Sequence, residues 1–311
     1  MIHWKKKGVI YCPDGTSAVM HSHAAIPFGM LTKEGLRIYF SARNEQGRSL
    51  PFYLDTDAAN LQQIQYVHTE PILPLGALGT FDDAGIMPSC VIESEGLHFM
   101  YYIGWNPQVT VSYRLSIGLA VSSDGGYRFS KYAAAPISDR SLEEPFFNTA
   151  PFVLKEGSLW RMWYISTTAW HMIDGYPEPQ YHVKYAESAD GIHWEKTGVV
   201  CIDYDATAEA IGRPSVIRED GIYKMYYSYR RLRGYRTERW AGYQIGYAES
   251  EDGISWEKKN HEAGIGLSED VLAWDYQMME YCHVLQTGVG KVMLYNGNGF
   301  GKTGFGYAVG E

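Results

Sequence analysis

The feature that most constrains this chain is an internal repeat of about 62 residues. The segment GIHWEKTG at 191–198 returns as GISWEKKN at 253–260, and VKYAESAD at 183–190 returns as IGYAESED at 245–252. Self-similarity at a fixed period is the signature of a repeat architecture. The aligned aromatic residues are Phe40, Tyr102, Tyr164, Tyr227 and Tyr295, spaced 62, 62, 63 and 68 residues apart. Five units therefore account for the 311 residues.

Each unit contains several short runs of β-branched and aromatic residues separated by turn residues, which is typical of strands. Four-stranded units repeated around an axis are the blades of a β-propeller. Helical periodicity is nearly absent, and we expect short helices only near 57–65 and 268–279. The sequence thus predicts an all-β protein, a five-bladed β-propeller with four-stranded antiparallel blades.

The two ends of the chain complement each other. The fifth unit stops at GFGYAVGE (304–311), after its third strand. The N-terminal segment IHWKKKGV (2–9) matches the fourth-strand segment IHWEKTGV (192–199) at six of eight positions. The N-terminal strand is therefore expected to complete the last blade, which removes an exposed sheet edge. Residues 1–311 are predicted to form one domain.

Composition narrows the possible partners and location. The 27 basic and 36 acidic residues give a net charge of −9, which argues against a nucleic-acid partner. No run of 18 apolar residues is present, so no membrane partner is expected. The N-terminus lacks the apolar region of a signal peptide, which favours a cytoplasmic location. Four dispersed cysteines, Cys12, Cys90, Cys201 and Cys282, predict neither a zinc site nor a disulfide framework, and no metal or cofactor is expected.

Loop lengths predict which face of the ring is functional. Within each unit the first and second strands are joined by short turns, as are most third and fourth strands, for example at Asp190-Gly191. Such dipeptides supply the positive-φ residues that hairpins require, so these acidic turns are expected to serve the fold. The remaining connections are long and carry polar and aromatic residues. Because binding residues concentrate in long loops on a rigid scaffold, we expect the site on that face.

Three carboxylates are predicted to be catalytic because they lie near the starts of first strands, closest to the axis. They are Asp83, Glu209 and Glu280. Carboxylates with separated pKa values perform acid–base and glycosyl-transfer chemistry. Each has an alternative role: Asp83 in a turn, Glu209 as a surface carboxylate, and Glu280, within the apolar MMEYCHV, in a structural ion pair.

The long loops also supply candidate substrate-binding residues. Planar guanidinium groups bind phosphate or carboxylate by two-point contacts, and tryptophan rings stack on sugars. The arginine-rich segment 230–239 has an alternative role, as a solvated loop whose charges pair with neighbours. The predicted binding residues are His23, Arg43, Trp105, Trp170, His171, Arg213, Arg230, Trp240 and Tyr281.

The YAES-x-DGI-x-WEK units, the inner strands beginning MPS (87–89) and RPS (213–215), and the five-fold count resemble the five-bladed propeller superfamily of arabinanases, invertases, levansucrases and mannosyl phosphorylases. This resemblance implies a hydrolase or related glycosidase with acidic residues at the inner-strand mouths, matching Asp83, Glu209 and Glu280 here. Where the resemblance implies a catalytic aspartate in the first blade, the sequence instead reads HSHAAIPF (21–28).

We therefore expect a carbohydrate-active enzyme that cleaves or transfers a glycosidic bond in a central funnel. Its partner would be a small carbohydrate or sugar conjugate, possibly anionic. The general acid is expected to be Glu209 or Glu280, with the other or Asp83 as base. Two alternatives stay open. A non-catalytic sugar-binding propeller is favoured by the first-blade histidines, and a phosphate-dependent glycoside phosphorylase by the arginines.

Overall fold

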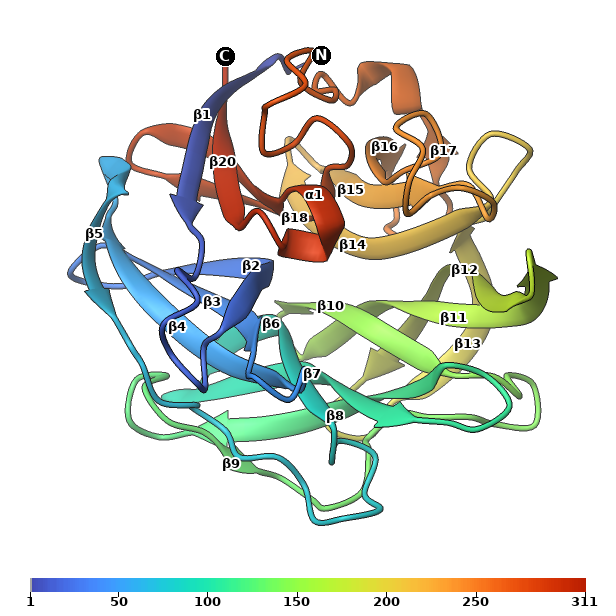
Figure 1. Ribbon diagram of the computed structural model, residues 1–311. Helices are drawn as coiled ribbons and strands as arrows, with labels where there is room; N and C mark the ends of the chain where they lie inside the picture. Colours follow the sequence, from blue (N-terminus) through green and yellow to red (C-terminus); the bar gives the residue numbers. More distant parts are fainter. Residues whose placement is uncertain (1) are drawn as a thin grey trace.

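The computed structural model describes residues 2–311 as a ring of β-sheets around a central axis (Figure 1). One four-stranded sheet has the order β1 (Trp4–Tyr11), β20 (Phe305–Gly310), β19 (Gly290–Asn296) and β18 (Glu280–Thr287). A second contains β10 (Asn148–Glu156), β11 (Leu159–Ile173), β12 (Tyr176–Ser188) and β13 (Glu195–Ile202). A third contains β14 (Ala210–Glu219), β15 (Ile222–Arg230), β16 (Gln244–Ser250) and β17 (Glu257–Lys258). The sequence prediction of an all-β protein with four-stranded antiparallel sheets is confirmed.

The remaining strands form one eight-stranded sheet with two parts. The first part holds β2 (Ser22–Leu31), β3 (Leu36–Arg43), β4 (Ser49–Asp57) and β5 (Asn60–Val67). The second holds β6 (Gly85–Ser94), β7 (Leu97–Pro107), β8 (Tyr113–Ser122) and β9 (Ser130–Lys131). A single parallel bridge between Ser49 and Gly85 joins β4 to β6, whereas pairing within each part is antiparallel.

The N-terminal strand closes the ring. β1 pairs antiparallel with β20, with Trp4 opposite Gly310 and Lys6 opposite Ala308. Trp4 is buried, and its ring packs edge-on against Tyr226 of the neighbouring sheet, with the centroids 5.6 Å apart. The prediction that the first strand completes the last sheet is confirmed.

Both expected helices are wrong. Residues 57–65 form the β4–β5 hairpin, because the Asp57 carboxylate accepts hydrogen bonds from the backbone N–H groups of Ala59 and Asn60 and fixes a tight turn. Residues 268–279 form turns and bends. The short helical elements described are η1 (Asn260–Glu262) and α1 (Asn298–Gly301). Among residues 2–311, no helix is long and apolar enough to cross a membrane.

The Asp-Gly turns hold neighbouring sheets together. Asp190 Oδ1 accepts hydrogen bonds from the N–H groups of Ile192 and His193 at 2.8 Å and so shapes its turn. Tyr101, in the preceding sheet, donates its hydroxyl to the Gly191 carbonyl at 2.8 Å. Trp163 donates equivalently to the Gly253 carbonyl of the next turn. These contacts support the expectation that the acidic turns serve the fold.

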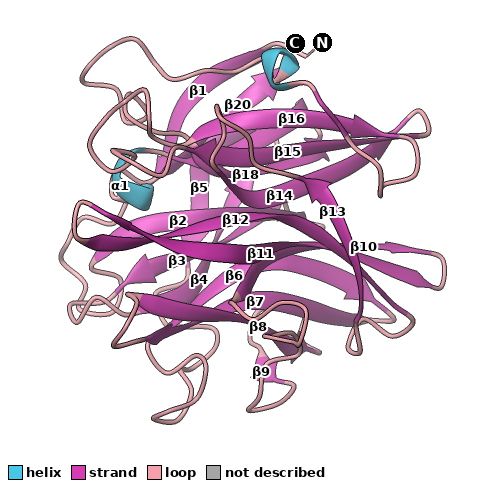
Figure 2. Ribbon diagram, turned by 90° about the vertical axis from the view of Figure 1, so that its right-hand side faces the viewer, coloured by secondary structure: helices cyan, strands magenta, loops and turns pink. Residues whose placement is uncertain are grey.

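Seen from the side, the longer loops and α1 lie at the left of the ring (Figure 2).

Three sheets carry the same buried cluster under the long-loop face. In each, a loop carboxylate accepts a hydrogen bond from the hydroxyl of a second-strand tyrosine and pairs with the ammonium group of a fourth-strand lysine. Because removing one member leaves a buried charge unpaired, these clusters fasten the outer strand to the sheet. They are Asp82–Tyr102–Lys131, Glu144–Tyr164–Lys196 and Asp275–Tyr295–Lys6.

The last cluster predicts how strongly closure depends on one ion pair. Lys6 Nζ lies 2.7 Å from the Asp275 carboxylate, which is 1% exposed. Lys6→Met should lower the free energy of unfolding by about 3 kcal/mol in urea titrations, because Asp275 loses its ammonium partner. Lys5→Met is the matched control: its pair with Glu311 is 60% exposed on both sides, so its effect should stay below about 1 kcal/mol. Equal losses in the two variants would contradict this role for Lys6.

Candidate active site

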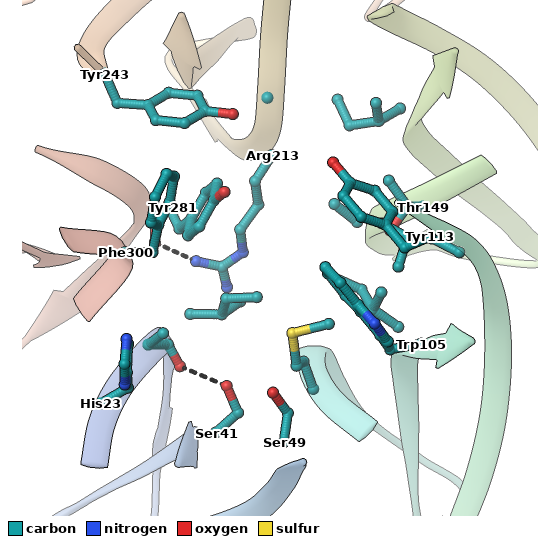
Figure 3. A pocket seen from close by; sticks show the side chains of 18 of the residues that line it. His23, Ser41, Ser49, Trp105, Tyr113, Thr149, Arg213, Tyr243, Tyr281 and Phe300 are labelled. Carbon is teal, nitrogen blue, oxygen red and sulfur yellow. Dashed lines mark hydrogen bonds between the residues drawn. The ribbon is translucent and has the colours of Figure 1, made fainter. Parts of the chain in front are cut away.

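A cavity of about 190 Å³ opens at the centre of the ring on the long-loop face (Figure 3). Its walls are mostly aromatic, and Figure 3 shows Trp105 and Tyr113 facing Tyr281 and Tyr243 across it. Each of the strands β2, β6, β10, β14 and β18 contributes one residue to its floor. In each strand this is the residue directly before a repeated position, which is occupied by Pro27, Pro88, Pro151, Pro214 and Cys282. These floor residues are Ile26, Met87, Ala150, Arg213 and Tyr281.

The backbone is irregular at this floor. Three floor residues, Ile26, Ala150 and Tyr281, have φ values of 55°, 47° and 55°, which non-glycine residues rarely adopt. β-Bulges bend a strand and re-aim side chains, and strained backbone gathers at functional sites. The strand pairing shifts register at Ala25/Phe28, Pro88/Cys90, Thr149/Phe152, Gly212/Ser215 and Glu280/His283.

Arg213 extends from β14 into the centre of the cavity (Figure 3) and is 1% exposed. Its guanidinium donates hydrogen bonds to the backbone carbonyls of Pro27, Ser89, Tyr281 and Cys282, so it ties β2, β6 and β18 together. Its Nε has no hydrogen-bond partner, and no ion pair to it occurs within residues 2–311. Burial lowers its pKa to about 10, which leaves it charged at neutral pH. The floor therefore carries a positive charge that no carboxylate neutralises.

Arg43 and His23 form a second polar group on the cavity wall. The Arg43 guanidinium is half-buried, and in the described part of the chain it makes no side-chain hydrogen bond or ion pair. His23 Nδ1 lies 3.0 Å from Ser22 Oγ. Burial, followed by the charges of Arg43 and Lys302, lowers the His23 pKa to about 4. His23 is therefore neutral near pH 7, beside a guanidinium that is free to bind an anion.

Glu280 lies directly before the floor residue Tyr281 and is fully buried. Its Oε1 accepts a hydrogen bond from Asn296 Nδ2 at 2.9 Å, and its Oε2 has no partner. Burial raises its pKa well above the ordinary range, and this effect outweighs the lowering by Asn296, Tyr281 and the more distant arginines. Burial therefore favours the protonated form of the Glu280 carboxyl group.

None of the three predicted catalytic carboxylates lines the cavity, and Asp83 and Glu209 have other roles. Asp83 accepts hydrogen bonds from Asn106 Nδ2 at 2.9 Å and from the Gly79 N–H at 2.8 Å. Glu209 Oε2 accepts one from the Leu232 N–H at 2.9 Å. Both carboxylates thus shape loops, and across residues 2–311 no Asp or Glu is among the cavity-lining residues. The three acids are not gathered around one hollow, and their catalytic roles stay predictions.

The predicted sugar-stacking and histidine residues divide between the wall and the outside. Trp105 lines the cavity, whereas Trp170 packs behind it against Tyr113, with ring centroids 5.4 Å apart. Trp240 is 64% exposed at a loop tip. His171 lies outside the lining, with Nε2 2.9 Å from Gln180 Oε1. Of the predicted binding residues, the structure therefore brings His23, Arg43, Trp105, Arg213 and Tyr281 together around the cavity.

Arg230 lies behind the wall rather than in a solvated loop. It is 1% exposed, and its Nε lies 3.2 Å from the Tyr181 hydroxyl and 3.1 Å from that of Tyr243. Its guanidinium also stacks 3.8 Å from the ring centroid of Tyr235. All three tyrosines line the cavity, so Arg230 holds wall residues in place. Arg233, by contrast, forms an exposed pair with Asp174, as the solvated-loop alternative expects.

Sequence reasoning missed much of the aromatic wall. Wall residues that were not predicted include Tyr113, Phe147, Tyr181, Tyr235, Arg236, Tyr243 and Phe300. Phe147, Tyr235, Arg236 and Tyr243 come from loops whose path the repeat does not specify, whereas Tyr113 and Tyr181 lie in β8 and β12. The floor residues Ile26, Met87 and Ala150 could have been predicted from the repeat. They stand at the same position of their units as Arg213 and Tyr281, directly before the repeated proline or cysteine. Among residues 2–311, no cluster of His, Cys, Asp or Glu has the geometry of a metal site.

Comparison with curated sequences finds two close matches. The uncharacterized protein Rv1502 of Mycobacterium tuberculosis is 37% identical over 308 residues, covering 98% of each chain. The uncharacterized protein MT1551, from another strain of that species, matches over the same length with the same identity. No protein-family model matches the chain.

Comparison with solved structures finds glycoside hydrolase propellers. A glycosidase-like structure from Bacteroides thetaiotaomicron has a TM-score of 0.73 at 14% identity, covering 98% of this chain and 95% of that one. A thermostable family-43 glycoside hydrolase has a TM-score of 0.64 at 16% identity, with coverages of 96% and 91%. A β-fructofuranosidase of Bombyx mori has a TM-score of 0.62 at 15% identity, covering 99% of this chain and 61% of that one. The chain therefore shares its fold with these glycoside hydrolases.

The buried acid predicts a pH-dependent stability difference. The folded-state pKa of Glu280 lies above its unfolded value. The contribution of the protonated Glu280 to the free energy of unfolding is therefore complete below about pH 4, and it is lost as pH rises toward the folded pKa. Glu280→Gln, which keeps the shape but cannot ionise, should be more stable than the native protein near neutral pH. The difference in unfolding free energy should grow by up to about 1.4 kcal/mol per pH unit above pH 5, as measured by urea titration. The exposed Glu93→Gln is the control, and a pH-independent difference in Glu280→Gln would contradict the burial of a neutral acid.

Proposed function

We propose that this chain, which belongs to the family of the uncharacterized Mycobacterium tuberculosis proteins Rv1502 and MT1551, is a carbohydrate-active enzyme that acts on a glycosidic bond in the central cavity. The observation that carries this proposal is one buried carboxyl group, Glu280, whose pKa is raised by burial and which directly precedes the cavity residue Tyr281. The cavity is lined by aromatic rings and by the guanidinium groups of Arg43 and Arg213. Its location is expected to be cytoplasmic.

We also infer that residues 1–311 form one five-bladed propeller. Support comes from the single bridge between Ser49 and Gly85, which marks a boundary between two four-stranded blades within the eight-stranded sheet. Further support comes from the floor, because each of five first strands contributes one residue to it. A central site of this kind needs all five blades in one unit, since its lining residues are dispersed along the chain.

The wall suits a sugar ring that carries a negative charge. Trp105 and Tyr113 present aromatic faces with centroids 4.3 Å apart, and Thr149 and Tyr281 add hydroxyl groups. Arg43 and the Nε of Arg213 are donors without protein partners, and charge-assisted hydrogen bonds to them are stronger than neutral ones. Because no carboxylate in the lining competes for these donors, we infer that an anionic group of the substrate occupies them.

In the proposed reaction Glu280 protonates the glycosidic oxygen, the bond from that oxygen to the sugar carbon breaks, and the leaving group departs as an alcohol. The sugar carbon then accepts a nucleophile. Water would need a base to take its proton, whereas inorganic phosphate would need none. The lining, as far as residues 2–311 show it, contains no carboxylate that could act as this base, so phosphorolysis or transfer to an anionic acceptor stays open beside hydrolysis.

The test of catalysis is turnover by Glu280→Gln on a panel of neutral and anionic glycosides, assayed with and without inorganic phosphate. Loss of the proton donor should reduce turnover by at least 100-fold while ligand binding is retained, because Gln keeps the acceptor oxygen for Asn296. Glu93→Gln, at an exposed site on the opposite end of the channel, should keep native turnover. Native turnover in Glu280→Gln would refute the assignment.

The anion preference has its own test by calorimetry. Arg43→Gln should weaken binding of an anionic sugar about 10-fold to 100-fold, since one charge-assisted contact is lost, and should leave a neutral analogue nearly unchanged. The exposed Arg48→Gln serves as the matched control. Equal weakening of both ligands would show that Arg43 shapes the wall rather than binding charge.

A non-catalytic sugar-binding propeller is the second candidate. The observation in its favour is the cavity lining itself, which contains His23 but no carboxylate. This alternative predicts saturable calorimetric binding with no product by mass spectrometry after long incubation. It also predicts that Glu280→Gln binds as the native protein does, with or without added phosphate.

A further inference from the structure

The most exposed apolar side chains of the molecule gather on the cavity face. Within residues 2–311, seven large apolar residues are at least 64% exposed, and every one of these lies on a loop or hairpin end on the side where the cavity opens. Most of the other exposed large apolar residues, such as Leu31 and Val200, are about half-exposed or less and lie on the opposite face or at an outer strand. Tyr176, which is 47% exposed, lies at the β11–β12 hairpin end on the cavity side. The seven are Leu78, Val109, Leu142, Met172, Trp240, Val271 and Leu272.

Three of these loops also contribute to the site. Val109 lies between Trp105 and Tyr113, both of which line the cavity, and the loop of Leu142 ends at the wall residue Phe147. The loop that carries Trp240 also supplies Tyr235. A surface that covers these three tips would therefore lie over the entrance to the cavity.

A lipid bilayer fits this arrangement better than a folded partner. The tips are single residues on separate loops, for example Leu78 at 99% and Leu142 at 98% exposure, rather than one continuous patch. A rigid protein would need a matching pocket for each tip, whereas fluid hydrocarbon accommodates side chains at different depths. Trp240 suits the interface because it combines an apolar ring with an N–H donor. No spanning segment is needed for a protein that lies on a membrane surface.

The charge of the cavity identifies the part of the lipid that enters it. The Arg43 guanidinium makes no side-chain hydrogen bond or ion pair within residues 2–311, and it matches the phosphate of an anionic lipid headgroup. The buried Arg213 adds its positive charge at the floor. Acidic residues such as Glu143, Glu269 and Asp270 flank the apolar tips, and the chain has a net charge of −9. Binding to the surface must therefore come from apolar insertion rather than from attraction to anionic lipids.

From these observations, and resting on the proposed function for the chemistry, we propose that the loop tips insert into the surface of a lipid bilayer. The cavity then receives a saccharide that a lipid phosphate anchors in that bilayer. This assigns the enzyme an amphiphilic, lipid-linked substrate, and it revises the expectation from the sequence that no membrane takes part.

The experiment is co-sedimentation of the full chain with phosphatidylcholine vesicles, with and without added phosphatidylglycerol, at low and high salt. The native protein should bind both vesicle types with little salt dependence. The combined variant Leu78→Ser, Val109→Ser, Leu142→Ser and Leu272→Ser should partition at least tenfold less, since each buried methylene contributes about fourfold. The control Leu31→Ser, Val199→Ser and Val200→Ser, away from the mouth, should bind like the native protein.

Several outcomes would overturn the proposal. They are absence of vesicle binding by the native protein, binding that needs phosphatidylglycerol and disappears in salt, and equal binding by the combined variant. Self-association of the native chain in sedimentation velocity, abolished in the combined variant, would assign the tips to a second copy instead. Urea unfolding should confirm that both variants fold. Calorimetry with a soluble sugar phosphate separates the two proposals, because the combined variant should retain that binding even if vesicle binding fails.

Discussion

Antiparallel pairing of β1 with β20 is the contact on which the rest of the structure depends. It joins the first residues of the chain to the last, and the buried pair of Lys6 with Asp275 fixes it. Only a closed ring brings β2 beside β18, and that approach places the Pro27, Tyr281 and Cys282 carbonyls around the Arg213 guanidinium. The positive charge on the axis is thus a consequence of closure, because the strands themselves supply its hydrogen-bond acceptors.

The balance of charge follows from the same geometry. Four carbonyl dipoles orient Arg213 but do not neutralise it, and burial lowers its pKa only to about 10. Glu280, which directly precedes the floor residue Tyr281, does not pair with this charge, and burial raises its pKa and favours its neutral form. An arrangement in which the cation stays charged while the acid is protonated is electrostatically incomplete. The anionic substrate group that we propose would balance this charge, and it would also favour a protonated His23.

Sequence reasoning reached the fold because the repeat carries it. Period, turn dipeptides and the match between residues 2–9 and 192–199 specify strands, hairpins and closure, all of which are local or periodic properties. The helix expected near 57–65 failed because the Asp57 side chain organises a tight turn that competes with helix formation. The site was reached only in part. Arg213 and Tyr281 occupy an aligned position next to the axis, whereas Tyr235 and Tyr243 reach the wall from a loop that has no periodic signal.

The acidic residues show why a position near the start of a first strand does not by itself identify a catalytic residue. Asp82 and Asp83 are adjacent in FDDAG, yet Asp82 is 1% exposed and pairs with Lys131, while Asp83 braces its own loop through Asn106. In such sheets one loop carboxylate is required to hold the outer strand, and a sequence pattern cannot distinguish it from a carboxylate that meets substrate. What distinguishes Glu280 is the lack of any lysine or arginine in an ion pair with it. A buried acid with no ion-pair partner is costly for the fold, and that cost is the physical argument that it serves chemistry rather than closure.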